Sequence, residues 1–437
     1  MNERRVVITG IGVVTASGIG IEELFENLCR KHCSIKRIDM FDPSGFACQI
    51  AGQLDGFSAR KYTPKSYRKA VKVMARDIEI AVAAADLAIR DAGIITRGID
   101  EQNVNIDSSR FGSNIGAGLM CTDLDELGIA VNTSVTDGKF DFKKWGREGM
   151  ENLTPLWLLK YLPNMLACHV TIIHGAKGPS NTITCGEASG HLAVGEASRV
   201  IARGSVDVNI AGGAESKVHP LHLLRQDLLG RLTTTHNDNP TEACRPFDAN
   251  HSGTVIGEGG GLLLLEDHDR AVNRSARIYA EVVGFGTRCD PNGVNFLNPP
   301  SSSALTRAII SALEDAQIAP EQVDLVIPHG SGVPAEDIAE AQAIHQALGQ
   351  HAQNVPVCPL TGSYGNLFAG AGAVALAVAA TALYKQTIPP AVNFETPDEA
   401  CNLNINRELT QKEINYVLST ASSIGGQYAA VVLKRYE

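Results

Sequence analysis

Two residues in the segment 178–190 have side chains that could carry covalent or acid–base chemistry, Cys185 and Glu187. The segment has the pattern of a strand that ends in a turn and leads into an Ala-rich helix. A side chain on such a turn lies at the helix N-terminus, where the helix dipole lowers the pKa of a thiol and favours an anion. Glu187 occupies the turn. Cys185 lies two residues earlier, before the turn, so a buried or interface cysteine is its simpler interpretation.

Two other patterns suggest a cofactor or a metal. Gly10 and Gly12 follow a strand-like run, as in dinucleotide-binding turns, but Thr15 stands where the third glycine of that motif belongs. A tight turn from strand to loop is the better interpretation. Cys29 and Cys33 lie four residues apart without a second Cys or His pair, so we interpret them as buried small side chains. The sequence therefore predicts no cofactor-binding residues and no metal site.

The composition argues against several classes of function. The chain has 437 residues, 44% of them hydrophobic and 20% charged, which is enough to bury a large core. A formal net charge of −10 argues against a nucleic-acid partner. We find no secretory leader and no run of about 18 apolar residues, so we expect no membrane contact. Ten cysteines without paired spacing are typical of reduced thiols, which predicts a cytoplasmic protein.

Strand and helix patterns alternate along the chain, which predicts an α/β fold. Apolar runs predict strands at 6–10, 206–211, 261–266, 278–284, 323–328 and 429–434. Ala-rich runs predict helices at 77–91, 192–202, 304–316, 336–347 and 371–384. Many of these helices are apolar nearly all round, so we expect them to be buried. Two connections rich in Pro and Gly, 238–246 and 292–303, are predicted to be ordered loops.

The two halves of the chain resemble each other. The run AIRDAGI at 88–94 parallels ALEDAQI at 312–318, and each ends a helix that leads to a strand and a glycine turn. The opening strands also match, with VITGIG at 7–12 against VVGFGT at 282–287. This shared order indicates a duplicated α/β unit, with an N-terminal half at 1–268 and a C-terminal half at 269–437. The polar, irregular segment 121–155 is predicted to be an insertion or cap in the first half.

Six motifs in the same order resemble those of the β-ketoacyl synthases of fatty-acid and polyketide pathways. They are the opening strand at 5–17, the nucleophile turn at 178–190, AGGAE at 211–215, RPFD at 245–248 with GEGG at 257–260, HGS at 329–331 and IGG at 424–426. The family has the thiolase-like fold. The resemblance therefore implies two duplicated βαβαβαββ halves in a layered α-β-α-β-α structure, which agrees with the internal repeat.

The resemblance also assigns catalytic positions. In that family a cysteine thiolate takes up the acyl chain, two histidines bind the malonyl thioester and a lysine supports them. Counting from either flank of the turn places the cysteine at Glu187. The second histidine aligns with Asn366, the lysine with Thr361 and a gating phenylalanine with Ser422, so that only His329 remains. A carboxylate is a poor acyl acceptor because its product is an easily hydrolysed mixed anhydride. We therefore expect no catalytic residues for condensation.

A ketosynthase homologue without its cysteine resembles the chain length factor, or ketosynthase β, of bacterial type II polyketide synthases, which usually carries glutamine at that position. The resemblance implies a heterodimer with an active ketosynthase and a role in shaping the acyl tunnel. It implies no cofactor, because the substrates travel on the phosphopantetheine of an acyl carrier protein. Leu119 and Met120 are candidate tunnel residues, although a place in the core would explain each equally well.

Residues 60–76 carry seven basic side chains and no acidic one. Arg68, Lys69 and Lys72 in this segment are candidates for docking the acidic carrier protein, where they would act on encounter rate and orientation. A solvated helix face explains the same pattern equally well.

The glutamate itself leaves alternatives open. A carboxylate at this helix N-terminus should stay ionised and would repel the carboxylate of a malonyl group. We therefore expect Glu187 to be hydrogen-bonded or ion-paired, facing His329. The first alternative is an enzyme that decarboxylates malonyl-carrier protein or transfers acyl groups through Glu187 or Cys185. The second is a structural homologue that works as a homodimer in another lipid pathway.

Overall fold

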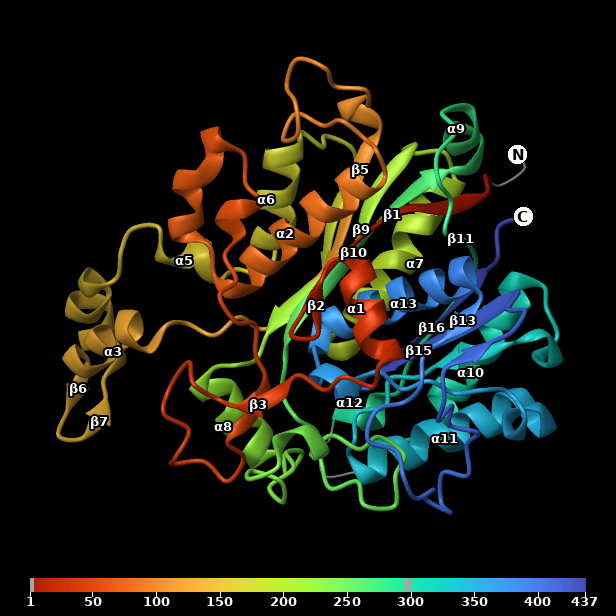
Figure 1. The fold of residues 1–437 in the computed structure, drawn as a ribbon. Coiled ribbons are helices and arrows are strands. Elements are labelled where there is room, and N and C mark those ends of the chain that lie inside the picture. Colours follow the sequence, from red (N-terminus) through yellow and green to blue (C-terminus); the bar gives the residue numbers. More distant parts are fainter. Residues whose placement is uncertain (1–3, 295–299) are drawn as a thin grey trace.

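The computed structural model describes residues 4–294 and 300–437, and it builds the same succession of elements twice (Figure 1). The first repeat consists of β1 (Val6–Thr15), α2 (Arg76–Asp91), β5 (Phe111–Gly116), α6 (Met165–His174), β8 (Ser180–Ile183), α7 (Ser189–Ala202), β9 (Val208–Ser216) and β10 (Glu258–Asp267). The second consists of β11 (Ala280–Cys289), α10 (Ser302–Ala316), β12 (Leu325–Ile327), α11 (Pro334–Leu348), α13 (Ala371–Lys385), β15 (Tyr416–Ser422) and β16 (Gln427–Lys434). Val357 forms a single parallel bridge with Val326 where the first repeat has β8.

The strands form one large sheet in the order β12-β15-β16-β11-β1-β10-β9-β5-β8, and the short β2 (Gly18–Ile19) pairs with β1. Counted outward from β1, the pairings with β10, β9, β5 and β8 are antiparallel, antiparallel, parallel and parallel. The pairings outward from β11 follow the same pattern as far as β12. The predicted α/β fold with two βαβαβαββ units is therefore confirmed. The predicted boundary after residue 268 coincides with the start of α9 (His268–Asn273) and stays a prediction.

Three layers of helices enclose the two parts of the sheet. Helices α7 and α13 pack on each other in the middle and contact strands of both repeats, while α2 covers the first repeat and α10 the second (Figure 1). Helix α13 is buried along its whole length from Gly372 to Leu383, which suits a helix that is apolar all round. The stretch Phe368–Lys385 is long and apolar enough to cross a membrane, but 83% of it is buried inside this fold.

The Gly10-x-Gly12 pattern is a packing feature inside a strand, so the predicted turn is wrong. A Cβ atom on Gly10 would lie 2.2 Å from the carbonyl oxygen of Ala88 in α2, because helix and strand are in close contact there. The second repeat has the same arrangement, with Gly284 at 2.2 Å from the carbonyl oxygen of Ala312 in α10. Both strands also shift register at this glycine. The glycines thus allow helix packing in each repeat, and the strand continues past them to Thr15.

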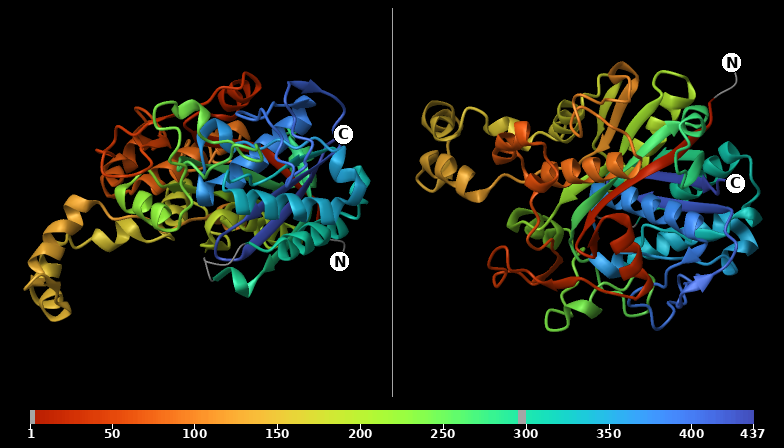
Figure 2. Two further views of the ribbon diagram at one scale, coloured as in Figure 1. Left: turned by 90° about the horizontal axis from the view of Figure 1, so that it is seen from below. Right: turned by 45° about the horizontal axis from the view of Figure 1, so that its top comes forward.

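Residues 121–161 form an arm that projects from the body of the molecule (Figure 2). It contains α3 (Leu124–Thr133), a hairpin of β6 (Val135–Thr136) and β7 (Lys139–Phe140), α4 (Phe142–Lys144), η4 (Trp145–Gly149), η5 (Met150–Asn152) and α5 (Trp157–Tyr161). The predicted insertion or cap, residues 121–155, lies within this arm and stays a prediction. Many large apolar side chains of the arm are exposed, with Phe142 reaching 82%. A free chain rarely keeps such a surface uncovered.

The other described elements are short and lie between the strands and helices of the two repeats. They are α1 (Ile21–Cys29), β3 (Ile35–Arg37), β4 (Ile50–Gly52), η1 (Ala59–Lys61), η2 (Lys65–Val73), η3 (Ser108–Arg110), η6 (Gly186–Ala188), α8 (Pro220–Leu228), η7 (Pro240–Glu242), η8 (Pro291–Val294), η9 (Pro320–Gln322), η10 (Gly349–Gln353), α12 (Thr361–Tyr364), η11 (Phe368–Gly370), β13 (Thr387–Ile388) and β14 (Thr410–Gln411). Residues 238–246 form an ordered loop around η7. Of the other predicted loop, residues 295–299 lie outside the described part of the chain.

Candidate functional site

Glu187 lies on the turn η6, directly before α7, as the strand-turn-helix pattern predicts. Gly186 makes this turn possible, because its φ of 55° belongs to the left-handed region and a Cβ atom there would lie 2.3 Å from Oγ of Ser423. The backbone N–H of Cys185 donates to Oγ of Ser189 at 2.8 Å and fixes the entry to the helix. Glu187 is buried, with 2% of its surface exposed.

The partner of Glu187 is Arg231, which the sequence analysis did not single out. The Arg231 Nη2 atom lies 2.9 Å from Oε1 of Glu187, and both side chains are buried. The contact is one of charge only, because Oε1 makes no hydrogen bond with any described residue. The same guanidinium donates to both carboxylate oxygens of Glu336, at 2.8 and 2.9 Å, and to Gln226 at 3.0 Å. Burial by itself would raise the pKa of Glu187, but the charges of Arg231 and then His329 outweigh it, so this pKa lies below its ordinary value. Glu187 is therefore an ionised carboxylate in a buried ion-pair network.

His329 is held by its backbone rather than by its ring. Glu340 accepts from the backbone N–H groups of His329 and Gly330, at 2.9 and 2.8 Å. The ring atom Nε2 of His329 has no hydrogen-bond partner among the described residues although it is buried. The ring is close enough to Glu187 to lower the pKa of that carboxyl. A histidine is thus present near Glu187, but its buried Nε2 atom makes no hydrogen bond with any described side chain.

Two of the three other substituted positions, Asn366 and Thr361, carry side chains that hydrogen-bond to the backbone. The Oδ1 atom of Asn366 accepts from the backbone N–H of Phe368 at 2.8 Å, and its buried Nδ2 lacks a partner in the described structure. The hydroxyl of Thr361 donates to the carbonyl oxygen of Gly330, next to His329. Ser422 ends β15 outside the cavity described below. None of these groups is a base or a cation that could assist a condensation.

A cavity of about 410 Å³, the first cavity, opens next to Glu187. Its apolar wall includes Leu119, which is 58% exposed, whereas Met120 is only 5% exposed and packs in the core. Of the two tunnel candidates the structure therefore places only Leu119 on the cavity. Ser423 and Ile424, rather than Ser422, line it from the C-terminal glycine loop.

The polar wall of the first cavity consists mainly of side chains that neutralise one another. Beside Glu187 and Arg231 it contains Glu215 and Lys217, which form a second buried ion pair. Glu215 also accepts from the backbone N–H of Ala369 at 2.8 Å. The AGGAE motif identifies Glu215 in the sequence, but nothing in the spacing indicates that Lys217 and Arg231 would turn toward the same cavity.

Cys185 does not line the first cavity, and burial, followed by the effect of Cys289, raises the pKa of its thiol. The thiolate is therefore disfavoured near neutral pH, which is the opposite of what a nucleophile requires. Acyl transfer needs a free nucleophile on this turn. Glu187 is instead held in an ion pair with Arg231. In the described part of the chain no cluster of three metal-ligating side chains is found.

The basic segment lies mainly in η2. Lys69 and Lys72 are exposed, whereas Arg68 is half-buried and donates to the carbonyl oxygen of Thr63 at 3.4 Å. These three side chains form no ion pair with any described residue. Arg76, at the end of the same segment, differs because it is paired with Glu258 at 2.9 Å. The charges of the three docking candidates are thus not neutralised by a described residue. Arg76 instead stabilises the fold through its ion pair.

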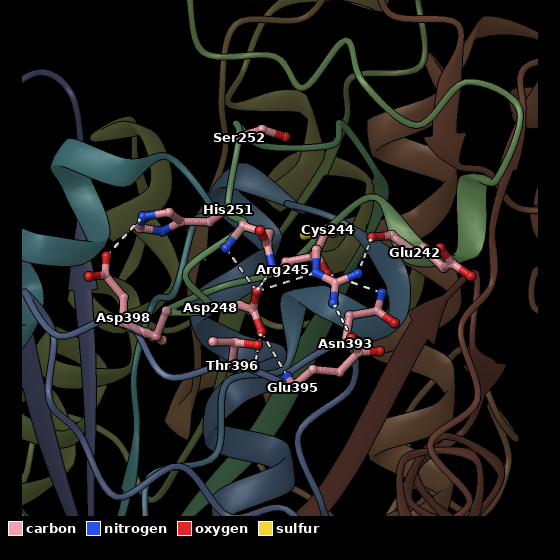
Figure 3. Close-up of polar contacts among 12 residues, drawn as sticks. Glu242, Cys244, Arg245, Asp248, His251, Ser252, Asn393, Glu395, Thr396 and Asp398 are labelled. Atoms are coloured by element: carbon pink, nitrogen blue, oxygen red, sulfur yellow. Dashed lines mark hydrogen bonds and ion pairs between the residues drawn. The ribbon is translucent and has the colours of Figure 1, made fainter.

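The RPFD motif organises a second polar cluster away from the first cavity (Figure 3). Asp248 is fully buried and accepts from the backbone N–H groups of Glu395 and Thr396, at 2.7 and 2.8 Å. Its Oδ1 lies 3.5 Å from Nε of Arg245. The ring of His251 lies between Asp337, at 3.1 Å, and Asp398, at 3.2 Å. This cluster ties together segments that are far apart in the sequence.

Two family models match the chain. The model "Beta-ketoacyl synthase, N-terminal domain" matches residues 3–271, and "Beta-ketoacyl synthase, C-terminal domain" matches residues 279–395. The 3-oxoacyl-[acyl-carrier-protein] synthase 2 of Synechocystis is 32% identical, over 100% of this chain and 99% of its own length.

Two solved structures are similar along their whole length. The ishigamide ketosynthase/chain length factor covers 100% of both chains with a TM-score of 0.83 and 26% identity. A ketosynthase of the AntDE:AntF complex, in which a type II PKS acyl-carrier protein is bound, covers 100% of both chains with a TM-score of 0.83 and 27% identity.

Proposed function

Because the chain belongs to the β-ketoacyl synthase family, we propose that it is the chain length factor of a bacterial type II polyketide synthase, a subunit that does not itself condense. The observation that carries this proposal is the ion pair between Glu187 and Arg231 on the nucleophile turn. An ionised carboxylate paired with a buried guanidinium is a poor acyl acceptor, and it would repel a malonyl carboxylate. The family's fold is retained while its reaction centre is replaced.

The proposed partner is an active ketosynthase, bound along the arm and the sheet edge. Strand β8 is the last strand of the sheet, and its first residues Ser180 and Asn181 are exposed. An open edge strand is a site for pairing with another chain. The arm adds exposed apolar side chains, which are Leu124, Ile129, Val135, Phe140, Phe142, Met150, Leu156, Leu158 and Leu159. A heterodimer would cover this surface, and we expect the complex to be cytoplasmic.

In this role the subunit shapes the acyl tunnel, and Leu119 contributes to its wall. Two features support the use of an acyl carrier protein that delivers the substrates on phosphopantetheine. The charges of Lys69 and Lys72 are free and exposed, and the solved relative AntDE binds a carrier protein. Arg68 would then help to orient the carrier through its partly exposed head.

Co-expression tests the proposal. The chain expressed alone should be largely insoluble or unstable, and an active ketosynthase of the same pathway should bring it into a soluble 1:1 heterodimer. Replacing Phe142 in the arm by Asp should weaken that heterodimer at least about tenfold, because an apolar side chain at an interface is replaced by an unpaired charge. Leu409→Asp, an exposed leucine outside the arm, is the matched control. A stable homodimer that ignores the ketosynthase would contradict the proposal.

The alternative function is decarboxylation of malonyl-carrier protein, or acyl transfer, by this chain through Glu187 or Cys185. The retained His329, with its free Nε2 atom beside Glu187, is the observation that favours it. The chain length factor proposal predicts that the purified heterodimer, with the cysteine of its ketosynthase replaced, releases no CO₂ from malonyl-carrier protein and carries no acyl group. Decarboxylation that disappears with Glu187→Ala would establish the alternative.

A further inference from the structure

A second cavity, of about 440 Å³, lies at the base of the arm. Its walls come from five segments, which are residues 40–41, residues 74–77, the two ends of the arm at 121–125 and 160–161, and residues 216–220. Its volume falls within the range of small-molecule sites in proteins. Nothing in the family motifs refers to it.

The second cavity shares a wall with the first. Along residues 215–218 alternate side chains point to opposite sides, so that Glu215 and Lys217 line the first cavity and Ser216 and Val218 line the second. The segment after β5 also borders both cavities, since Leu119 lines the first and Cys121 lines the second. The two cavities are therefore neighbours on either side of one layer of side chains.

The cations and the hydroxyl donors of the second cavity already have partners among the described residues. Arg76 is paired with Glu258 at 2.9 Å, and Lys160 is paired with Glu126 at 2.6 Å. The hydroxyl of Tyr161 also donates to Glu126, at 2.8 Å. The hydroxyl of Ser216 donates to Glu258 at 3.0 Å. A ligand that needs donors or positive charge from the protein would find none free among these groups.

Apart from His219, whose Nδ1 accepts from the backbone N–H of Leu221 at 3.2 Å, the side chains that remain are acceptors, and the most buried of them is Asp77. It is only 4% exposed, lines the cavity and accepts from the backbone N–H of Ser216 through Oδ1 at 3.2 Å. Its Oδ2 has no hydrogen bond or ion pair with any described residue. Burial, followed by repulsion from Glu215, raises the pKa of Asp77 to about 7. Near neutral pH a hydroxyl group would find a partner here in either protonation state, because it both donates and accepts. Asp123 and Asp125 add acceptors at the exposed rim.

The rest of the wall is apolar and polarisable. Met40, Phe41, Met74 and Val218 line it, and thioether and aromatic side chains make favourable contacts with aromatic rings. We propose that the second cavity is a binding site for an aromatic ring that carries a hydroxyl group, with the hydroxyl on Asp77 and the ring between the methionines and Phe41. If the chain has the function proposed above, this group is the starter end of the growing acyl chain.

The binding step can be tested with p-cresol as the probe, by titration calorimetry on the heterodimer. We expect p-cresol to bind at least about tenfold more tightly than 4-methylanisole, which has the same ring but no hydroxyl proton to donate. Asp77→Leu should lower the affinity for p-cresol by a similar factor. Met40→Trp, which fills the cavity from its exposed rim, should abolish binding, and Met150→Trp on the arm is the matched control.

Three results would overturn the site. They are equal affinity for p-cresol and 4-methylanisole, unchanged binding by both Asp77→Leu and Met40→Trp, and tighter binding of 4-methylbenzylamine, which would indicate a site for cations. The link to the acyl chain has its own readout, since Met40→Trp should alter the length or yield of the products of the reconstituted synthase. If Met40→Trp leaves the products unchanged while the unmodified chain still binds p-cresol, only the starter-end assignment is refuted. The chain length factor role is tested separately by co-expression.

Discussion

Two buried clusters of charge lie on different loops of this fold, and they are held in different ways. Around the RPFD motif, Asp248 accepts from the backbone N–H groups of several residues (Figure 3). At the nucleophile turn, Glu187 relies on one side chain, Arg231. Next to it, buried ring and amide nitrogens of His329 and Asn366 have no partner in the described structure.

This difference indicates which positions can change without loss of the fold. A carboxylate that satisfies backbone groups of several segments is difficult to replace, because its loss leaves buried N–H groups unpaired. A position whose only contacts are side chains can change together with its partner. The nucleophile turn belongs to the second kind, which explains how a family member can keep the scaffold and replace the reaction centre.

The largest expected effect comes from breaking the cluster at the nucleophile turn. Arg231→Met leaves the buried Glu187 and the half-buried Glu336 without their arginine partner, so the free energy of unfolding should fall by about 3–5 kcal/mol. Urea unfolding of the purified protein, together with its proposed ketosynthase partner, measures the change. The double variant Arg231→Met with Glu187→Gln should be more stable than Arg231→Met alone. If the added Glu187→Gln change lowers stability further, the two side chains are not coupled as described.

A smaller loss is expected from the motif cluster. Asp248→Asn keeps the shape of the side chain but replaces one acceptor oxygen by an NH₂ group, so that either the N–H of Asn250 at Oδ1 or those of Glu395 and Thr396 at Oδ2 lose their acceptor. We expect a loss of about 2 kcal/mol in the free energy of unfolding. Asp269→Asn, at a carboxylate that is 90% exposed, is the control and should change stability by less than about 0.5 kcal/mol. Equal effects of the two substitutions would remove the distinction between the clusters.

A pH dependence is expected from the same cluster. Burial would lower the pKa of His251, but Asp337 and Asp398 outweigh it, and the pKa of the folded protein lies above its ordinary value. Its contribution to stability is therefore complete below the pKa of the unfolded chain, about 6.5, and is lost as the pH rises through the folded pKa. Unfolding measured at about pH 6 and about pH 9 should show this loss. His251→Gln should reduce the difference between the two pH values, and an unchanged difference would rule out this ring as its source.

The smallest effect on stability is expected at Glu187 itself. Glu187→Gln keeps the volume of the side chain and leaves Arg231 paired with Glu336, so the free energy of unfolding should change by about 1 kcal/mol. The pKa of Glu187 is lowered in the folded protein, so its contribution is present at neutral pH and is lost as the pH falls through the folded pKa. Thermal unfolding at neutral pH measures the change. A loss as large as that of Arg231→Met would mean that Glu187, and not Glu336, is the main partner of the arginine.

The sequence predicted the fold well because the fold depends on local patterns. Ala-rich helices and apolar strands have clear periodicities, and the duplicated runs at 88–94 and 312–318 end helices that are equivalent in the two repeats. The error at Gly10 arose because a glycine that allows a helix to approach a strand has the same local sequence as a glycine turn.

The site was predictable only in part. Motif spacing placed Glu187 on its turn, since that position is set by local geometry. It could not reveal Arg231, because a side chain 44 residues away reaches Glu187 only through the tertiary fold. Leu119 and Met120 are adjacent in sequence, yet one lines a cavity and the other is buried in the core. Asp77 was missed because a single acidic residue in a helical run has no distinctive pattern.

The central claim is that this subunit supports a condensation whose chemistry belongs to its partner. The most direct test is product formation by the reconstituted heterodimer with its carrier protein and malonyl donor, comparing Glu187→Ala in this chain with replacement of the ketosynthase cysteine. We predict that the Glu187→Ala heterodimer, if folded, keeps the rate of product formation within about twofold, whereas loss of the ketosynthase cysteine abolishes it. Loss of product formation with Glu187→Ala in a correctly assembled heterodimer would contradict the account.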